Sequence, residues 1–158
     1  MEKDLLFQSE EGFFNVRAAG VLVKDNMLLL QKDIGGSEYA LPGGQVRFCE
    51  EAKNALEREF IEETGAKIQT GKLMWTEECF WTMNGADRHT ITFYFEVFDT
   101  ENALPAVPDK FVPQNDNPNV VWGFVPIAAL DNITVYPSFL ARALSKTAPG
   151  ILHFITKA

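Results

Sequence analysis

Apolar and polar residues alternate along much of the chain, and this period of two residues is typical of half-buried β-strands. A turn at Lys24-Asp25-Asn26 separates the first two predicted strands, and Gly71 interrupts a later one. The pattern predicts extended segments over residues 16–23, 27–32, 39–41, 68–81, 89–98 and 120–125.

Two segments depart from this pattern and predict helices. Residues 50–64 contain good helix formers without glycine or proline, and Gly65 follows as the expected C-cap. Residues 137–147 predict a second helix, with Pro137 near its first turn and Pro149 just beyond its end. Strands combined with one central and one late helix indicate an α/β (α+β) fold with a mixed sheet.

The length of 158 residues fits one domain, so we expect residues 1–158 to fold as a single unit. Residues 1–15 begin polar and acidic and then gain three phenylalanines. This N-terminal extension is expected to add an edge strand or to cover part of the core. Residues 99–119 contain four prolines and little periodicity. A loop of that length is usually a lid, a binding loop or a disordered insert.

Composition adds a strong negative charge. Fourteen Lys and Arg against 22 Asp and Glu give a net charge of −8, which disfavours binding to nucleic-acid polymers and to anionic membranes. The charge is uneven, because residues 50–63 contain six acids and two bases and so carry half of the net excess. The helix predicted over this segment is therefore unusually acidic.

Cysteine usage and hydropathy bear on the compartment. Cys49 and Cys79 form no close pair, so a disulfide framework is not expected. The N-terminus lacks the basic and apolar regions of a signal peptide, and no apolar run reaches the roughly 20 residues of a membrane span. These features predict a cytoplasmic protein with reduced thiols and no membrane partner.

The acids of the central helix do not lie opposite its apolar face. At about 100° per residue, Glu59, Glu62 and Glu63 fall on or beside that face and close to one another. Their mutual repulsion, the helix dipole and partial desolvation all disfavour this arrangement. A divalent hard cation would neutralise the three acids, whereas Arg58 alone would not. An ordinary solvated acidic face remains the alternative. The apolar face consists of Ala52, Ala55, Leu56 and Phe60.

The loop before this helix adds independent weight. Leu41-Pro42-Gly43-Gly44 leads a rigid, glycine-containing backbone toward the helix. Glycines allow backbone carbonyls and amides to approach a metal or a phosphate without an intervening Cβ. A glycine-rich loop, a helix and three convergent acids within 25 residues are a stronger signal than any one of them.

These residues resemble the Nudix box, the signature of the Nudix hydrolase superfamily. Phe60 and Ala66 depart from the branched aliphatic residues usual at two apolar positions, which concerns packing rather than chemistry. Most of residues 16–145 are similar to MutT-like members of the superfamily. This resemblance implies a Nudix-type α/β/α sandwich with a mixed central sheet. The charged and glycine positions of the box are matched by Gly44, Glu50, Arg58, Glu59, Glu62, Glu63 and Gly65.

The resemblance implies a hydrolase that attacks a pyrophosphate with water and uses Mg²⁺ or Mn²⁺. Glu59 is the expected general base, Arg58 is expected to hold Glu59, and Glu50 is the expected ion-pair partner of Arg58. Asp116 lies in the loop before a late strand, from which a further ligand often comes, and Glu101 and Asp109 are weaker candidates. The implied metal ligands are Gly43 through its carbonyl, Glu59, Glu62, Glu63 and Asp116.

The expected substrate-binding residues are Arg17, Trp81 and Arg88. Trp81, Phe80 and Tyr94 offer rings on which a base could stack, although aromatic residues on strands more often belong to a core. Phosphate-contacting cations could come from Arg17, Lys32, Arg47 and Arg88, each of which could instead be an ordinary surface charge.

The leading hypothesis is a MutT-like (deoxy)nucleoside triphosphate pyrophosphohydrolase that includes oxidised or noncanonical nucleotides among its substrates. ADP-ribose, a nucleotide sugar or another diphosphate is the alternative within the class. A non-catalytic nucleotide-sensing or partner-binding domain is the alternative from a different class. The expected partner is a small nucleoside diphosphate derivative, and the resemblance is compatible with a homodimer.

Overall fold

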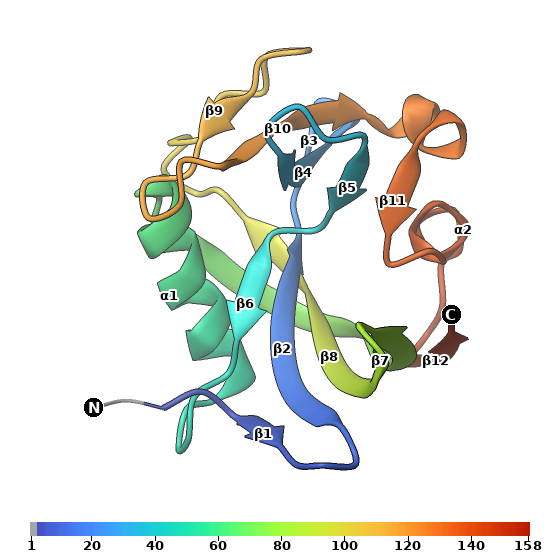
Figure 1. The fold of residues 1–158 in the computed structure, drawn as a ribbon. Helices are drawn as coiled ribbons and strands as arrows, with labels where there is room; N and C mark the ends of the chain where they lie inside the picture. The colour runs from blue at the N-terminus through green and yellow to red at the C-terminus, as the bar shows by residue number, and fades with distance from the viewer. Residues whose placement is uncertain (1–2) are drawn as a thin grey trace.

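The computed structural model describes residues 3–158, and its strands form two mixed sheets (Figure 1). Along the first sheet the order is β1-β2-β8-β7-β12, with β6 paired to β2. Its strands are β1 (Leu6–Gln8), β2 (Phe13–Val21), β6 (Gly43–Gln45), β7 (Gln69–Met83), β8 (Ala86–Phe98) and β12 (Leu152–Lys157).

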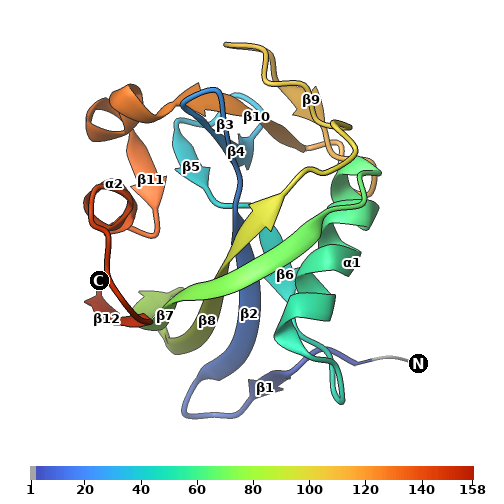
Figure 2. The same ribbon diagram turned by 180° about the vertical axis from the view of Figure 1, so that it is seen from behind.

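Along the second sheet the order is β11-β5-β4-β10-β9, with β3 paired to β4. Its strands are β3 (Val23–Lys24), β4 (Met27–Asp33), β5 (Glu38–Ala40), β9 (Val112–Pro113), β10 (Val120–Pro126) and β11 (Thr134–Tyr136). The helical segments are α1 (Ala52–Thr64), the 3₁₀ helix η1 (Ile127–Asn132) and α2 (Leu140–Leu144). Helix α1 lies on one side of the molecule, and η1 and α2 lie on the other (Figures 1 and 2).

The predicted mixed α and β architecture is confirmed, with its strands divided between two sheets. Asp25 and Asn26 both have positive φ, as the predicted turn between the first two strands requires. Gly65 ends α1 in the left-handed conformation, and its N–H donates to Ile61 O at 2.9 Å. The N-terminal extension adds the edge strand β1, which is antiparallel to β2.

The C-terminal part differs from the prediction. Helix α2 spans only Leu140–Leu144 instead of residues 137–147, because Pro137 and Ser138 form a preceding turn in which Leu140 N donates to Pro137 O. The 3₁₀ helix η1 and the strand β12 were not predicted. Strand β12 pairs in parallel with β7 and so extends the sheet at this edge. Its residues alternate between half-buried and exposed.

The two faces of the first sheet have different neighbours. Helix α1 covers one face, where its Leu56 and Phe60 pack with Ala18 of β2. The other face turns toward the second sheet and α2, where the rings of Trp75 and Tyr94 each lie 5.8 Å from that of Phe139 between centroids. Residues two positions apart on a strand share a face, so alternate residues of β2, β7 and β8 line the space between the sheets.

The proline-rich segment 99–119 is an ordered loop rather than a disordered insert. Lys24 Nζ anchors its beginning by donating to Asp99 Oδ2 at 2.8 Å and to the Leu104 carbonyl at 2.7 Å. Strand β9 pairs with β10 near its end. Among residues 3–158, no helix is long and apolar enough to cross a membrane.

Candidate active site

Helix α1 carries its acids at three different depths. Glu63 is buried with 7% of its surface exposed, Glu59 is half-buried, and the side chain of Glu62 is 40% exposed. Glu63 therefore lies on the same side as Leu56 and Phe60, as the helical periodicity predicts. The apolar residues that fix the helix on the sheet also hold this carboxylate inside the protein.

Arg58 organises the acids that surround it. Its Nε and Nη2 donate to the two carboxylate oxygens of Glu50 at 2.8 and 3.1 Å. Its Nη1 donates to Glu59 Oε1 at 2.7 Å, and its Nη2 donates to the Gln45 carbonyl at 2.9 Å. A guanidinium with this many acceptors is fixed in one orientation, and it fixes Glu59 in turn.

The charges of this network are tuned in opposite directions. The hydrogen bond from Arg58 lowers the pKa of Glu50, and burial only partly opposes it. Burial raises the pKa of Glu59 even though Arg58 contacts it directly. The hydrogen bond to Glu50 raises the pKa of Arg58 above its usual range. Glu50 and Arg58 therefore favour their charged forms as an ion pair, whereas burial disfavours the charged form of Glu59.

The glycine-rich loop places its backbone against the acids. Strand β6 pairs with β2 so that Gly44 lies opposite Ala18 and Gly43 opposite Ala19. Gly43 has φ +155°, and a Cβ there would overlap the carbonyl of Ala18. Arg17 Nη2 approaches the Gly43 carbonyl at 3.5 Å. Only glycine permits this close pairing, which brings the Gly43 carbonyl to the site.

Asp116 is brought to Glu63 by the loop before β10. Asn115 N donates to the Glu63 carbonyl at 2.8 Å, which holds this loop at the end of α1. Burial raises the pKa of Glu63 to about 8, and the nearby charges of Glu59 and Asp116 add to the shift. Glu101 and Asp109 are not among the charges that act on Glu63.

The residues present fit a divalent cation. Within residues 3–158, no group of three His, Cys, Asp or Glu side chains is already arranged as a metal site. The Glu63 carboxylate is nevertheless buried, and its pKa is raised first by this burial and then by the charges of Glu59, Asp116 and Glu62. Carboxylate oxygens and the Gly43 carbonyl are hard donors of the kind that Mg²⁺ and Mn²⁺ prefer.

A cavity of about 460 Å³ lies beside the acids, between the two sheets. Arg17 belongs to its lining and also approaches the Gly43 carbonyl, so it connects the cavity to the acidic site. Trp81 lines the same cavity with 37% of its surface exposed. The buried Tyr94 contributes its hydroxyl end, so two of the predicted aromatic residues border this space.

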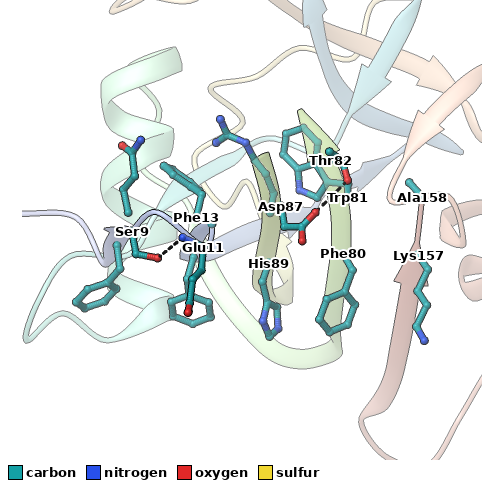
Figure 3. A pocket seen from close by; sticks show the side chains of 15 residues that line it. Ser9, Glu11, Phe13, Phe80, Trp81, Thr82, Asp87, His89, Lys157 and Ala158 are labelled. Carbon is teal, nitrogen blue, oxygen red and sulfur yellow. Dashed lines mark hydrogen bonds between the residues drawn. The ribbon is translucent and has the colours of Figure 1, made fainter. Parts of the chain in front are cut away.

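Arg88 lies elsewhere. It lines a second cavity of about 700 Å³ at the ends of β2, β7 and β8 (Figure 3). Its guanidinium carbon is 4.3 Å from the ring centroid of Phe13 and 5.4 Å from that of Trp81. Arg88 lies four positions along the sheet from the row of Arg17, which is about 13 Å at the usual strand rise. The structure therefore does not bring Arg88 to the acids, and Trp81 borders both cavities.

The remaining candidates have other neighbours. Phe80 stacks on His89 with ring centroids 4.4 Å apart and lies on the opposite face of the sheet from Trp81. Lys32 Nζ lies 5.1 Å from the ring centroid of Tyr39. Arg47 Nη2 lies 3.6 Å from Glu62 Oε1, so among these only Arg47 contacts a predicted metal ligand.

Glu77 was not predicted from the sequence, but it is buried with 4% of its surface exposed and lines the cavity of 460 Å³. Tyr94 Oη donates to Glu77 Oε2 at 2.5 Å. A signal was present, because Glu77 alternates with Trp75, Cys79 and Trp81 on one face of β7. An acid at an inward position of an aromatic strand is a departure from the usual pattern.

The family model described as NUDIX domain matches residues 14–143. A NUDIX hydrolase from Nitrosomonas europaea is similar with a TM-score of 0.61 and 14% identity, over 96% of this chain and 82% of that chain. A MutT protein from Bacillus halodurans is similar with a TM-score of 0.60 and 14% identity, over 88% and 89%. An ADP-ribose pyrophosphatase from Streptococcus suis gives 0.51 and 16%, over 89% and 98%. At identities this low, these structural similarities show a shared fold and no more.

Proposed function

The chain belongs to the NUDIX domain family and is a Nudix hydrolase, and from this premise we propose that it cleaves the pyrophosphate bond of a (deoxy)nucleoside triphosphate. The proposed reaction is MutT-like and depends on Mg²⁺ or Mn²⁺. Oxidised or noncanonical nucleotides belong to the same substrate class. MutT proteins among the similar structures support this choice through their fold alone.

One observation carries the proposal. Arg17 lines the cavity of 460 Å³ and also lies 3.5 Å from the Gly43 carbonyl, beside the acids of α1. A nucleotide with its base and sugar in the cavity would therefore present its phosphates to Arg17 and to the acidic site. Ligand sites of this kind are concave, largely apolar and provided with a few convergent polar groups.

The roles of the residues follow from their contacts. Glu59 is the proposed general base, because its raised pKa and its position against the backbone of Gly44 suit proton transfer from water. Arg58 is a positioning residue that holds Glu59, and Glu50 fixes Arg58. Arg17 would contact the phosphates directly.

The proposed metal ligands are Glu59, Glu62, Glu63, Asp116 and the Gly43 carbonyl. A divalent cation bound there would neutralise phosphate charge and lower the pKa of a coordinated water. The crowded carboxylates around Glu63 repel a free pyrophosphate, so they favour substrate only when a cation is bound.

Two other functions remain as alternatives. ADP-ribose, a nucleotide sugar or another diphosphate is a candidate substrate, and an ADP-ribose pyrophosphatase is among the similar structures. A nucleotide-sensing domain without catalysis is the candidate from a different class. Crowded buried acids argue against it, because a binding domain gains no stability from them.

The experiment that tests the proposal measures phosphate and pyrophosphate release from a panel of nucleotides and diphosphate derivatives at millimolar Mg²⁺ or Mn²⁺, with identification of the products. We expect nucleoside monophosphate and pyrophosphate from triphosphates, loss of turnover in excess chelator, and loss of most turnover in Glu63→Gln. Full turnover in chelator would refute the proposal. Preferential turnover of ADP-ribose or a nucleotide sugar would replace the substrate.

Compartment and assembly belong to the same proposal. The free thiols of Cys49 and Cys79 support a cytoplasmic location. Nothing in the net charge of −8 favours a nucleic-acid polymer as partner. A homodimer is compatible with the family, and light scattering of the purified protein measures it.

A further inference from the structure

Glu77 is a carboxylate in the lining of the cavity beside the acidic site. It is 4% exposed, and it accepts a hydrogen bond from the Tyr94 hydroxyl at 2.5 Å through Oε2. Within residues 3–158, Glu77 forms no ion pair, and its Oε1 accepts no hydrogen bond from another protein group. A buried carboxylate with a free oxygen costs desolvation energy that a ligand donor would offset.

The hydroxyl of Tyr94 holds one oxygen of Glu77, and both residues line the cavity. Burial and the adjacent Glu77 carboxylate raise the pKa of Tyr94 above its usual range, so the phenol stays protonated and donates. Burial, followed by the charge of Glu77, also raises the pKa of the Cys79 thiol in the same cavity lining. Glu77 thus offers a carboxylate acceptor to the cavity that it lines.

The position of Glu77 relative to Arg17 suits a nucleoside. Arg17 pairs with Thr92 on β8, and Thr92 pairs with Glu77 on β7, so the three residues form one row across the sheet. Two strand spacings separate Arg17 from Glu77, which is about 10 Å. A phosphate held at Arg17 would leave the sugar and base to extend toward Glu77. Trp81, on the same face, offers a ring for stacking.

The acceptor chemistry selects among bases. A carboxylate offers two adjacent acceptors and therefore matches an edge with two adjacent N–H donors. Guanine has such an edge in its N1–H and 2-amino groups. Adenine and cytosine place a ring-nitrogen acceptor beside their amino donor, and uracil and thymine flank one N–H with two carbonyls. Each of these edges would bring an acceptor against the Glu77 carboxylate.

We propose that Glu77 is a specificity-determining residue that accepts hydrogen bonds from the N1–H and 2-amino groups of a guanine-type base. The assignment of the base rests on the proposed nucleotide function, because the cavity and the acidic site must act on one molecule. Tyr94 holds the carboxylate through Oε2, which keeps a second acceptor site, so Oε2 and the free Oε1 can together accept the two N–H groups of the base.

The test compares nucleotides that differ only at the base edge. The values of kcat/KM for dGTP, dITP and dATP are measured with the wild-type protein, with Glu77→Gln and with Glu78→Gln. Glu78 is the matched control, because it lies on the opposite face of the same strand and contacts His153 Nε2 at 2.8 Å. Circular dichroism and thermal unfolding verify that each variant is folded. Calorimetric binding of GMP, IMP and AMP adds a readout that needs no turnover.

We expect the wild type to favour dGTP over dITP by about tenfold or more and over dATP by more, because an unmatched buried acceptor is costly. In Glu77→Gln the preference for dGTP over dITP should fall to within about threefold, whereas Glu78→Gln should keep it. Equal kcat/KM values for dGTP and dITP in the wild type, or an unchanged preference in folded Glu77→Gln, would overturn the assignment.

The binding arm separates this inference from the proposed function. If no triphosphate is hydrolysed but GMP binds more tightly than IMP and loses this advantage in Glu77→Gln, the reaction is wrong and the base assignment stands. If triphosphates are hydrolysed but GMP, IMP and AMP bind equally, the base assignment is wrong and the reaction stands.

Discussion

Gly44 lies directly against the carboxylate of Glu59, and a Cβ built at position 44 would overlap that carboxylate. Arg58 Nη1 contacts Glu59 Oε1 at 2.7 Å. Glu59 is thus confined between the backbone of β6 and a guanidinium that is itself fixed by Glu50. Glycine is required at position 44 because a larger residue would occupy the space of the Glu59 carboxylate, and not because the backbone there has a positive φ.

Gly44→Ala should therefore displace Glu59 without unfolding the protein, because the far end of a glutamate moves more easily than backbone. A displacement of about 1 Å at a reacting group costs about 100-fold in kcat. The free energy of unfolding should change by less than about 1 kcal/mol. Steady-state kinetics and urea denaturation measure the two effects.

Gly150→Ala is the control for this prediction, because a Cβ at Gly150 meets no atom within 4 Å. It should leave both kcat and stability near the wild-type values. A wild-type kcat in Gly44→Ala would show that Glu59 is not needed where the structure holds it.

Arg58→Lys tests positioning by the guanidinium. Lysine keeps the positive charge but lacks the planar guanidinium. Only the guanidinium can donate at once to both carboxylate oxygens of Glu50 and to Glu59 Oε1. Loss of a residue that orients metal ligands typically costs about 10- to 100-fold in activity. We expect this loss in kcat, with KM changed little, because Arg58 does not line the cavity.

Arg142→Lys is the matched control. Arg142 belongs to α2, away from the acids, and its guanidinium lies over the ring of Phe154 on β12. Its kcat should equal that of the wild type. A rise in KM without a fall in kcat for Arg58→Lys would indicate that Arg58 contacts substrate rather than Glu59.

Glu63→Gln should stabilise the protein in chelator while it abolishes the stabilisation produced by Mg²⁺. Burial together with Glu59 and Asp116 makes the charge of Glu63 unfavourable without a cation. Removal of that charge should raise the free energy of unfolding by about 1 to 2 kcal/mol in chelator. Urea denaturation at pH 9, with and without Mg²⁺, measures both effects.

Glu101→Gln is the control, because Glu101 is exposed and its charge is not among those that act on Glu63. It should keep the increase in stability on addition of Mg²⁺. If Glu63→Gln kept this increase as well, Glu63 would not be a metal ligand.

The acidic site was more predictable from the sequence than the cavity beside it. Glu59, Glu63 and Gly44 belong to one loop and one helix, so helical periodicity and fixed spacing bring them together without knowledge of the rest of the fold. Asp116 was predicted from the resemblance, and its place beside Glu63 depends on the backbone hydrogen bond from Asn115.

The cavity depends on strand pairings between distant segments. Arg17 and Glu77 share a row only because β2 pairs with β8 and β8 pairs with β7, a register that no local pattern in the sequence specifies. The same register places Arg88 opposite Phe13 rather than in the row of Arg17. Arg88, a predicted substrate-binding residue, therefore lines the other cavity. The strand β12 was missed although its residues alternate, because its partner β7 is about 75 residues away.

Asp99→Asn should loosen the proline-rich loop in a pH-dependent way. Burial opposes the charge of Asp99, but hydrogen bonds from Lys24 and from the amides of Leu104 and Ala103 outweigh it and lower its pKa below 3.8. The ionised carboxylate therefore stabilises the fold fully above pH 3.8, and this contribution is lost as the pH falls through the lowered pKa.

At pH 7 the Asp99→Asn substitution should lower the free energy of unfolding, measured by urea denaturation, by about 1 to 3 kcal/mol. The difference from the wild type should shrink below pH 3.8. Asp131→Asn, at an exposed aspartate, should show neither effect. A cost that stayed constant across this range would mean that packing, not the charge of Asp99, holds the loop.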